Sequence, residues 1–146
     1  MFKFVVRRLA FLKYVPLLPQ VFDLLFKMWN GLFRPQLNDW NDQIEAEILQ
    51  IPGIELSLHK YGGTQFNYCT KELGHLHSNG LLDILTSKAV KAAYLSKGLA
   101  ENHHVMPQSG WVSFYIGSIE DQQQAVLLLK EAYERARNLE MKRNLP

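Results

Sequence analysis

Cysteine is nearly absent from this chain of 146 residues, which contains only Cys69. No disulfide bond can form within the chain, so we expect a reducing, cytoplasmic location. We expect Cys69 to lie in a strand as a small apolar residue.

A strong excess of charge of one sign is also missing, because the net charge is only +2. Residues 1–40 carry six basic and two acidic residues (+4), whereas residues 41–146 carry ten basic and twelve acidic residues (−2). This distribution argues against nucleic-acid binding by residues 41–146. The basic N-terminal segment could instead contact an anionic membrane surface.

Long hydrophobic runs are missing as well. Within residues 1–33 the longest stretch without charge has nine residues, Tyr14 to Phe22, and it contains Pro16 and Pro19. A membrane span needs about 20 apolar residues. No small-residue cleavage site follows the apolar stretch, so we expect neither a transmembrane helix nor a cleaved signal peptide.

The N-terminal pattern instead predicts two short amphipathic helices separated at Pro16–Pro19. Their apolar residues are Phe4, Val5, Leu9, Phe11 and Leu12 in the first helix, and Val21, Phe22, Leu25, Phe26 and Trp29 in the second. Two arrangements fit this pattern. The helices pack on the domain body or on a second copy of the chain through residues 1–35, or they lie on the inner face of a membrane as a peripheral contact.

Internal repeats, low-complexity segments and a glycine-rich phosphate loop are absent, which leaves one α+β domain (38–146) after an N-terminal helical segment (1–37). Alternation and turn residues predict strands over 54–61, 64–69, 71–77, 81–85 and 111–116. Caps and periodic apolar residues predict helices over 38–50, over 88–97 and from 118 onward. The expected fold is an antiparallel sheet of about four to five strands with helices on one face, plus the N-terminal amphipathic helices.

The densest group of residues that can move a proton or hold a metal lies in KELGHLHSNG and the following LLDIL. His75 and His77 are two apart on a predicted strand, so they project from one face, while alternation places Glu72 on the opposite face. Asp83 lies within an apolar strand, where burial without a partner would be costly, and a histidine is the expected partner.

The histidine pair has two chemical interpretations. It can act as a base with its orienting partner, or it can chelate a metal with a third ligand from Asp83, His103 or His104. His103 and His104 also fit a surface loop, and Trp111 fits either core packing or the wall of a pocket. We expect Tyr61, His104, Ser109 and Trp111 to contact a ligand, and His59 to face solvent.

The runs KELGHLH, LLDI and ENHHVMPQSGWVSF together resemble the small bacterial luciferase-domain proteins, whose namesake is the fungal luciferase that acts on a hydroxylated, hispidin-type pyrone. The resemblance covers residues 38–137 and is strongest over 71–83 and 101–115. By this resemblance, His75, His77 and His103 match histidines of the fungal enzyme, and Trp111 matches a tryptophan. Asp83 stands where the fungal enzyme has histidine, and the N-terminus here is shorter and broken by proline.

The resemblance implies that molecular oxygen is added as a co-substrate to a small enolic or aromatic molecule, without a metal, flavin or other cofactor. His75 or His77 would be the base, held by Asp83, with His103 at the same site. Light emission is not expected. Two other classes stay open: a non-catalytic module that binds a ligand or a protein, and a metal-dependent hydrolase that uses the same histidines.

Overall fold

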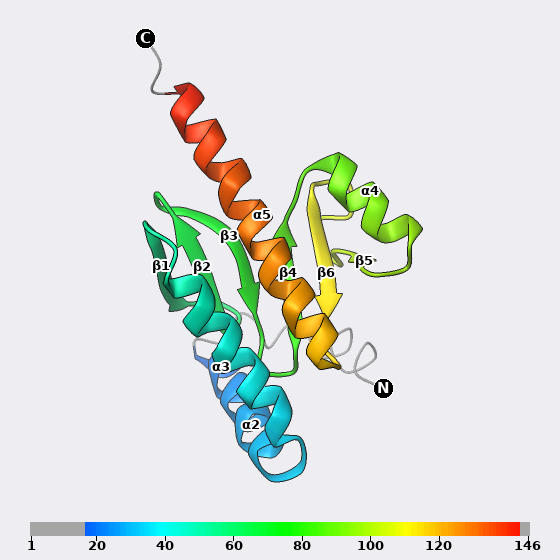
Figure 1. The fold of residues 1–146 in the computed structure, drawn as a ribbon. Helices are drawn as coiled ribbons and strands as arrows, with labels where there is room; N and C mark the ends of the chain where they lie inside the picture. Colours follow the sequence, from blue (N-terminus) through cyan, green and yellow to red (C-terminus); the bar gives the residue numbers. More distant parts are fainter. Residues whose placement is uncertain (1–16, 144–146) are drawn as a thin grey trace.

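The structure is a computed structural model that describes residues 17–143. Its architecture is α+β, as the sequence predicts (Figure 1). The helices are α2 (Leu18–Phe33), α3 (Pro35–Leu49), α4 (Lys88–Ser96) and α5 (Ile119–Arg143). The strands are β1 (Ile54–Leu58), β2 (Thr64–Tyr68), β3 (Lys71–Leu76), β4 (Leu81–Leu85), β5 (Glu101–Asn102) and β6 (Trp111–Tyr115).

These strands form one sheet of six strands in the order β1-β2-β3-β4-β6-β5, and every neighbouring pair is antiparallel. The sheet is larger than the expected four to five strands. The additional strand is β5, a two-residue segment of the predicted loop before Trp111 that pairs with β6.

The core fills the space between one face of the sheet and helices α3 and α5, which lie across that face (Figure 1). The buried apolar side chains are Phe66, Leu82, Ile84, Val112 and Phe114 from the strands, Leu37, Ile44 and Ile48 from α3, and Ala125, Leu128 and Leu129 from α5. Burying a large apolar side chain of this kind contributes about 1.5–3 kcal/mol. Because successive strand residues point to opposite faces, the residues between these core positions project from the other face of the sheet.

Tight turns join the first four strands, as predicted. Gly62 and Gly63 both have positive φ (86° and 83°). A Cβ on Gly63 would lie 2.2 Å from the carbonyl oxygen of Leu76, so this position requires glycine. The turn between β2 and β3 consists of Cys69 and Thr70, both with positive φ (47° and 64°). Cys69 is therefore an exposed turn residue, and its expected place in a strand was wrong.

The helix starts follow from local side-chain chemistry. The Ser87 hydroxyl accepts a hydrogen bond from the Val90 N–H and caps α4, and the Ser118 hydroxyl does the same for the Asp121 N–H at the start of α5. Helix α3 begins earlier than predicted, at Pro35, since proline is favourable in the first turn of a helix.

Helix α2 is the second predicted amphipathic helix and packs beside α3 (Figure 1). The first predicted helix, from Phe4 to Lys13, lies outside the described residues. Among the helices of residues 17–143, none combines the length and apolar character needed to cross a membrane.

Candidate functional site

A row of polar side chains crosses the sheet on the face opposite α3 and α5. In strand order from β1 to β5, the residues paired with one another are Ser57, Gln65, His75, Asp83, Ser113 and Glu101. Three of them, His75, Asp83 and Ser113, are buried. Burial of three polar groups next to one another is costly unless they bond to each other, so their contacts define a candidate site.

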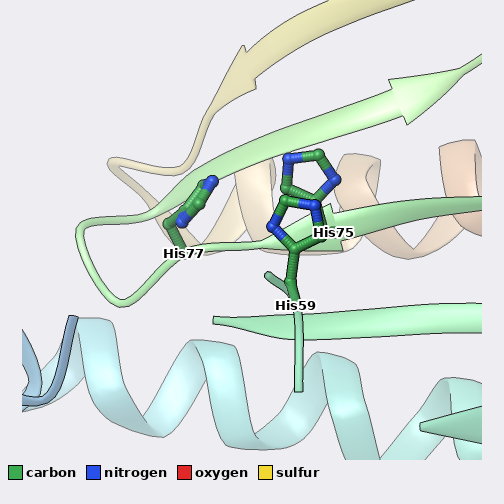
Figure 2. Close-up of side chains that lie close together, drawn as sticks. All are labelled: His59, His75 and His77. Carbon is green, nitrogen blue, oxygen red and sulfur yellow. The ribbon is translucent and has the colours of Figure 1, made fainter. Parts of the chain in front are cut away.

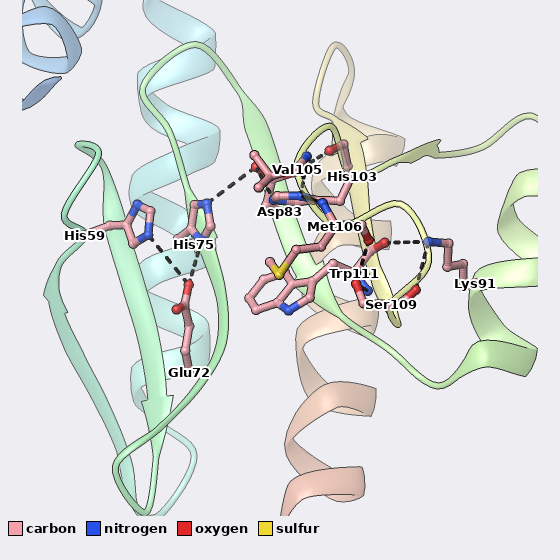
Figure 3. Close-up of polar contacts among 11 residues, drawn as sticks. His59, Glu72, His75, Asp83, Lys91, His103, Val105, Met106, Ser109 and Trp111 are labelled. Atoms are coloured by element: carbon pink, nitrogen blue, oxygen red, sulfur yellow. Dashed lines mark hydrogen bonds and ion pairs between the residues drawn. The ribbon is translucent and has the colours of Figure 1, made fainter. Parts of the chain in front are cut away.

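His75 lies between two carboxylates (Figure 3). Its Nδ1 is 2.6 Å from Glu72 Oε1, and its Nε2 is 3.4 Å from Asp83 Oδ2. Burial by itself would lower the pKa of His75, but the contacts with Asp83 and Glu72 outweigh it, and the pKa is raised above its ordinary value. Both ring nitrogens of the protonated form donate protons, and each carboxylate accepts one. The arrangement therefore favours a buried imidazolium.

The expected place of Glu72 on the opposite face from the histidines was wrong. The pairing of β2 with β3 shifts: Phe66 pairs with Gly74, but Asn67 pairs with Glu72. One additional residue, Leu73, is thus inserted in β3 as a β-bulge. The bulge reverses the alternation, and Glu72 projects from the same face as His75.

Asp83 is the most deeply buried acid of this group, with 1% of its surface exposed. Its Oδ1 accepts a short hydrogen bond from the Ser113 hydroxyl, and its Oδ2 faces Nε2 of both His75 (3.4 Å) and His103 (3.7 Å). Burial alone would raise the pKa of Asp83, but these partners stabilise the carboxylate and hold its pKa below the usual range. The structure therefore brings Asp83, His75 and His103 together.

The proton position on His103 follows from its hydrogen bonds. Nδ1 accepts hydrogen bonds from the backbone N–H groups of Val105 (3.1 Å) and Met106 (3.2 Å), so in the neutral ring the proton is on Nε2, which faces Asp83. Burial lowers the pKa of His103 and favours this neutral tautomer.

The loop that carries His103 is held by Lys91 of α4, a residue that sequence reasoning missed (Figure 3). Lys91 is buried, and its ammonium donates to the carbonyl oxygens of Pro107 (2.7 Å), Ser109 (2.9 Å) and Trp111 (3.1 Å). The Trp111 ring lies between the two histidines, 5.8 Å from the ring of His75 and 5.8 Å from that of His103. Lys91 thus fixes the chain that forms this wall of the site.

Replacing Lys91 with methionine is expected to lower the free energy of unfolding by about 2–3 kcal/mol, because three partly buried hydrogen bonds to carbonyl oxygens lose their charged donor. Urea unfolding measures this change. Lys88→Met, at an exposed position of the same helix, is the control and should change stability little. Equal effects of the two substitutions would contradict a role for Lys91 in holding the loop.

His59 was expected to face solvent, and this was wrong, because only 2% of its surface is exposed. Strand β1 ends at Leu58, and the turn closed by Gly62 and Gly63 directs the His59 ring onto the His75 ring (Figure 2). The two rings stack with centroids 3.7 Å apart and planes 11° apart. Burial and the adjacent His75 lower the pKa of His59 to about 4, so this ring is neutral at physiological pH.

His77 completes the group of three histidines in Figure 2. Its ring meets those of His75 and His59 edge-on, at 5.1 and 5.9 Å. Its Nδ1 is 3.9 Å from Asp23 Oδ1, a carboxylate of α2. Burial and then His75 lower the pKa of His77, so this ring favours the neutral form, whereas the pKa of its neighbour His75 is raised.

The other residues predicted to contact a ligand, Tyr61, His104 and Ser109, interact with residues other than the buried His75 and Asp83. Tyr61 is 43% exposed, with its ring 5.5 Å from that of His59, and the exposed His104 stacks on His103 at 4.7 Å. The Ser109 hydroxyl donates to the Met106 carbonyl and accepts from the Trp111 N–H, so it is occupied within its own loop.

Two groups of side chains in the described part of the chain have ligand atoms within 4.8 Å of one another: His59, His75 and His77, and Asp83, His103 and His104. In the first group, the stacked rings of His59 and His75 have nearly parallel planes. A metal ion binds a histidine nitrogen in the plane of the ring, and one ion cannot lie in two parallel planes. Binding would therefore require ring rotation and loss of the His75 contacts with Glu72 and Asp83.

Two open cavities of about 660 and 750 Å³ share Tyr68, Cys69 and Arg137 in their walls. No histidine lines either of them. The ionisable side chains with shifted pKa values lie instead at the row of polar side chains that crosses the sheet. We place the candidate site at this row because these groups converge there.

Residues 70–132 match the family model described as Luciferase domain. The matched segment contains Glu72, His75, Asp83 and His103, whereas His59 and helix α2 lie outside it. No curated protein matches the chain, and no solved structure matches it. The match supports a luciferase-like domain, and the matched segment runs from the β2–β3 turn into α5.

Proposed function

We propose that this chain is an oxygenase-type enzyme that adds molecular oxygen to a small enolic or aromatic molecule. The observation that carries the proposal is the His75 ring between two carboxylates, next to neutral histidines. Adjacent titratable groups whose pKa values are driven apart are typical of acid–base catalysis. The match to the Luciferase domain model is consistent with this chemistry.

His75 and His77, the two candidates for the base, have different roles in this proposal. His77, neutral and partly exposed, is the base that removes the proton of the enol, with Asp23 beside its Nδ1. His75, with its raised pKa, supplies positive charge that stabilises the enolate. The enolate carbon is then oxidised as it forms a bond to oxygen, and O2 is reduced to a peroxide that takes up the proton.

Neighbouring residues maintain this difference between the two histidines. Asp83, fixed by Ser113, keeps His75 protonated, and His103 donates its Nε2 proton toward the same carboxylate. Trp111 supplies an apolar wall next to both buried histidines, and such a wall would protect a reactive peroxide from water. Asp83, His75 and His103 thus act as one unit with Trp111.

Oxygen uptake tests the proposal, with a panel of 4-hydroxy-2-pyrones and hydroxylated aromatic compounds as substrates. His77→Ala is expected to lower turnover by about 10²- to 10⁴-fold, the usual contribution of a general base. Lys130→Ala, an α5 residue on the opposite face, is the control and should retain full activity. Unchanged turnover in both His77→Ala and His75→Ala would contradict the proposal.

A metal-dependent hydrolase is the competing enzyme class, and the stacking of His59 on His75 does not favour a metal at the group of His59, His75 and His77. Metal analysis of the purified protein separates the two classes. Stoichiometric zinc or iron that disappears in the His75→Ala/His77→Ala double variant would support the hydrolase. A protein that binds panel compounds without consuming oxygen would instead be a non-catalytic binding module.

A further inference from the structure

Helix α2 is amphipathic, but its polar side, and not its apolar side, faces the protein body. Gln20 Nε2 donates to the Lys60 carbonyl (2.9 Å), and Asp23 accepts hydrogen bonds from the N–H (2.9 Å) and the hydroxyl (2.7 Å) of Ser78. Asn30, the buried residue of the helix, donates to the Ser78 carbonyl (2.5 Å). Polar contacts therefore hold α2 on the body, and its apolar side is directed outward.

The outward side of α2 is almost entirely apolar. The exposed large residues of the helix and its N-cap are Leu17, Val21, Phe22, Leu24, Leu25, Met28, Trp29, Leu32 and Phe33. At 3.6 residues per turn they cover an arc of roughly 180°. Leu32 is 78% exposed, and Trp29 (58% exposed) packs its ring on Phe33 at 4.2 Å. An exposed apolar surface of this extent marks an interaction site.

The shape of this surface and the charge of the sequence before it favour lipid over a protein partner. A helix that packs on another protein element needs an apolar stripe of only about 100°, whereas a helix half immersed in a bilayer surface presents a broader arc. Tryptophan is enriched at membrane interfaces. The sequence before α2 is basic, because residues 1–16 contain Lys3, Arg7, Arg8 and Lys13 and no acidic residue. Anionic lipid headgroups attract such basic segments.

We propose that α2 lies flat on an anionic bilayer surface, with this apolar side immersed below the headgroups. The hydrogen bonds of Asp23 and Asn30 to the Ser78 turn then join the bilayer surface to β3. His77 is the residue before this turn, and its Nδ1 is 3.9 Å from Asp23. His77 therefore lies about one helix diameter, 10–12 Å, from the lipid.

Vesicle sedimentation of the full chain tests this proposal. The protein is expected to bind vesicles of phosphatidylcholine and phosphatidylglycerol, and to bind pure phosphatidylcholine vesicles at least about tenfold more weakly. The Leu25→Glu/Leu32→Glu double variant should lose at least about tenfold in binding to the anionic vesicles. Leu58→Glu, at a β1 position that is 68% exposed, is the matched control and should bind as the unmodified protein does.

Tryptophan fluorescence locates the immersed residue. Anionic vesicles should shift the emission of the unmodified protein to the blue, and Trp29→Phe should lose this shift while it still binds. Circular dichroism checks that the variants are folded, which their exposed positions favour. Equal binding of the double variant and the control would overturn the proposal. A dimer that the double variant converts to monomers, without vesicle binding by the unmodified protein, would identify a second copy as the occupant instead.

Discussion

Replacing Asp83 with asparagine is expected to lower the free energy of unfolding by about 3–5 kcal/mol, the usual effect of removing one partner of a buried ion pair. The side chain keeps its size, but an uncharged amide cannot accept the Ser113 hydrogen bond and also supply the negative charge that faces His75 and His103. At least one proton donor is then buried without an acceptor. Urea unfolding at pH 7 measures the change.

The same substitution should lower the pKa of His75. The contacts that raise this pKa come first from Asp83 and then from Glu72, and asparagine removes the first while burial still acts in the opposite direction. The raised pKa of His75 makes the stability of the fold depend on pH. Protonation of His75 stabilises the folded state fully below the unfolded pKa of about 6.5, and this contribution disappears as pH rises through the folded pKa. A proton NMR titration of His75 in both proteins checks the direction.

Ser113→Ala is the matched control for Asp83→Asn. It removes one hydrogen bond to the carboxylate and keeps the charge. We expect it to cost about 1–2 kcal/mol and to leave the His75 pKa raised. If Asp83→Asn proved no more destabilising than Ser113→Ala, the buried charge of Asp83 would not be what holds this site together.

Acid is expected to destabilise the fold through His59. Its pKa is about 4 in the folded protein and 6.5 without perturbation, so the unfolded state binds more protons between these values. Stability is therefore highest above pH 6.5 and falls as pH decreases toward 4. The difference of two to three pKa units corresponds to about 3 kcal/mol. His77 and His103 have lowered pKa values and act in the same direction, whereas His75 acts in the opposite one.

The His59→Phe variant isolates this effect. Phenylalanine keeps an aromatic ring on His75 and removes the titrating group, so stability at pH 7 should change little. The variant should become the more stable protein by about 3 kcal/mol as the pH approaches 4. Urea unfolding of both proteins from pH 7 to pH 4 provides the measurement. Parallel stability curves would show that His59 does not titrate as a buried neutral ring.

Local chemistry made much of the fold predictable. The glycines at 62, 63 and 80, the Ser87 and Ser118 caps and the alternation of β1, β2 and β4 each act over a few residues, so a short window of sequence contains their signal. The requirement for a partner of Asp83 was also visible, because a carboxylate within LLDIL cannot be buried alone.

Other parts of the site could not be predicted, because they depend on contacts between distant segments. The bulge at Leu73 breaks the two-residue period, and any argument from alternation then puts Glu72 on the wrong face. His59 is buried by the turn that follows it and by His75, which is 16 residues later in the chain. Lys91 carries an ordinary helical signal, and only the folded loop supplies its three carbonyls.

The sequence by itself determined that α2 has two faces, that β3 and β4 carry polar residues within apolar strands, and that one antiparallel sheet is covered by helices. Periodicity is a property of the chain, so these features need no knowledge of the fold. Only the tertiary structure decided which face of α2 points inward and which polar residues meet. Polar contacts with Ser78 turn the apolar side of α2 outward, and strand register aligns His75 with Asp83 and Ser113. Register and docking depend on pairing across the whole sheet, which no local pattern encodes.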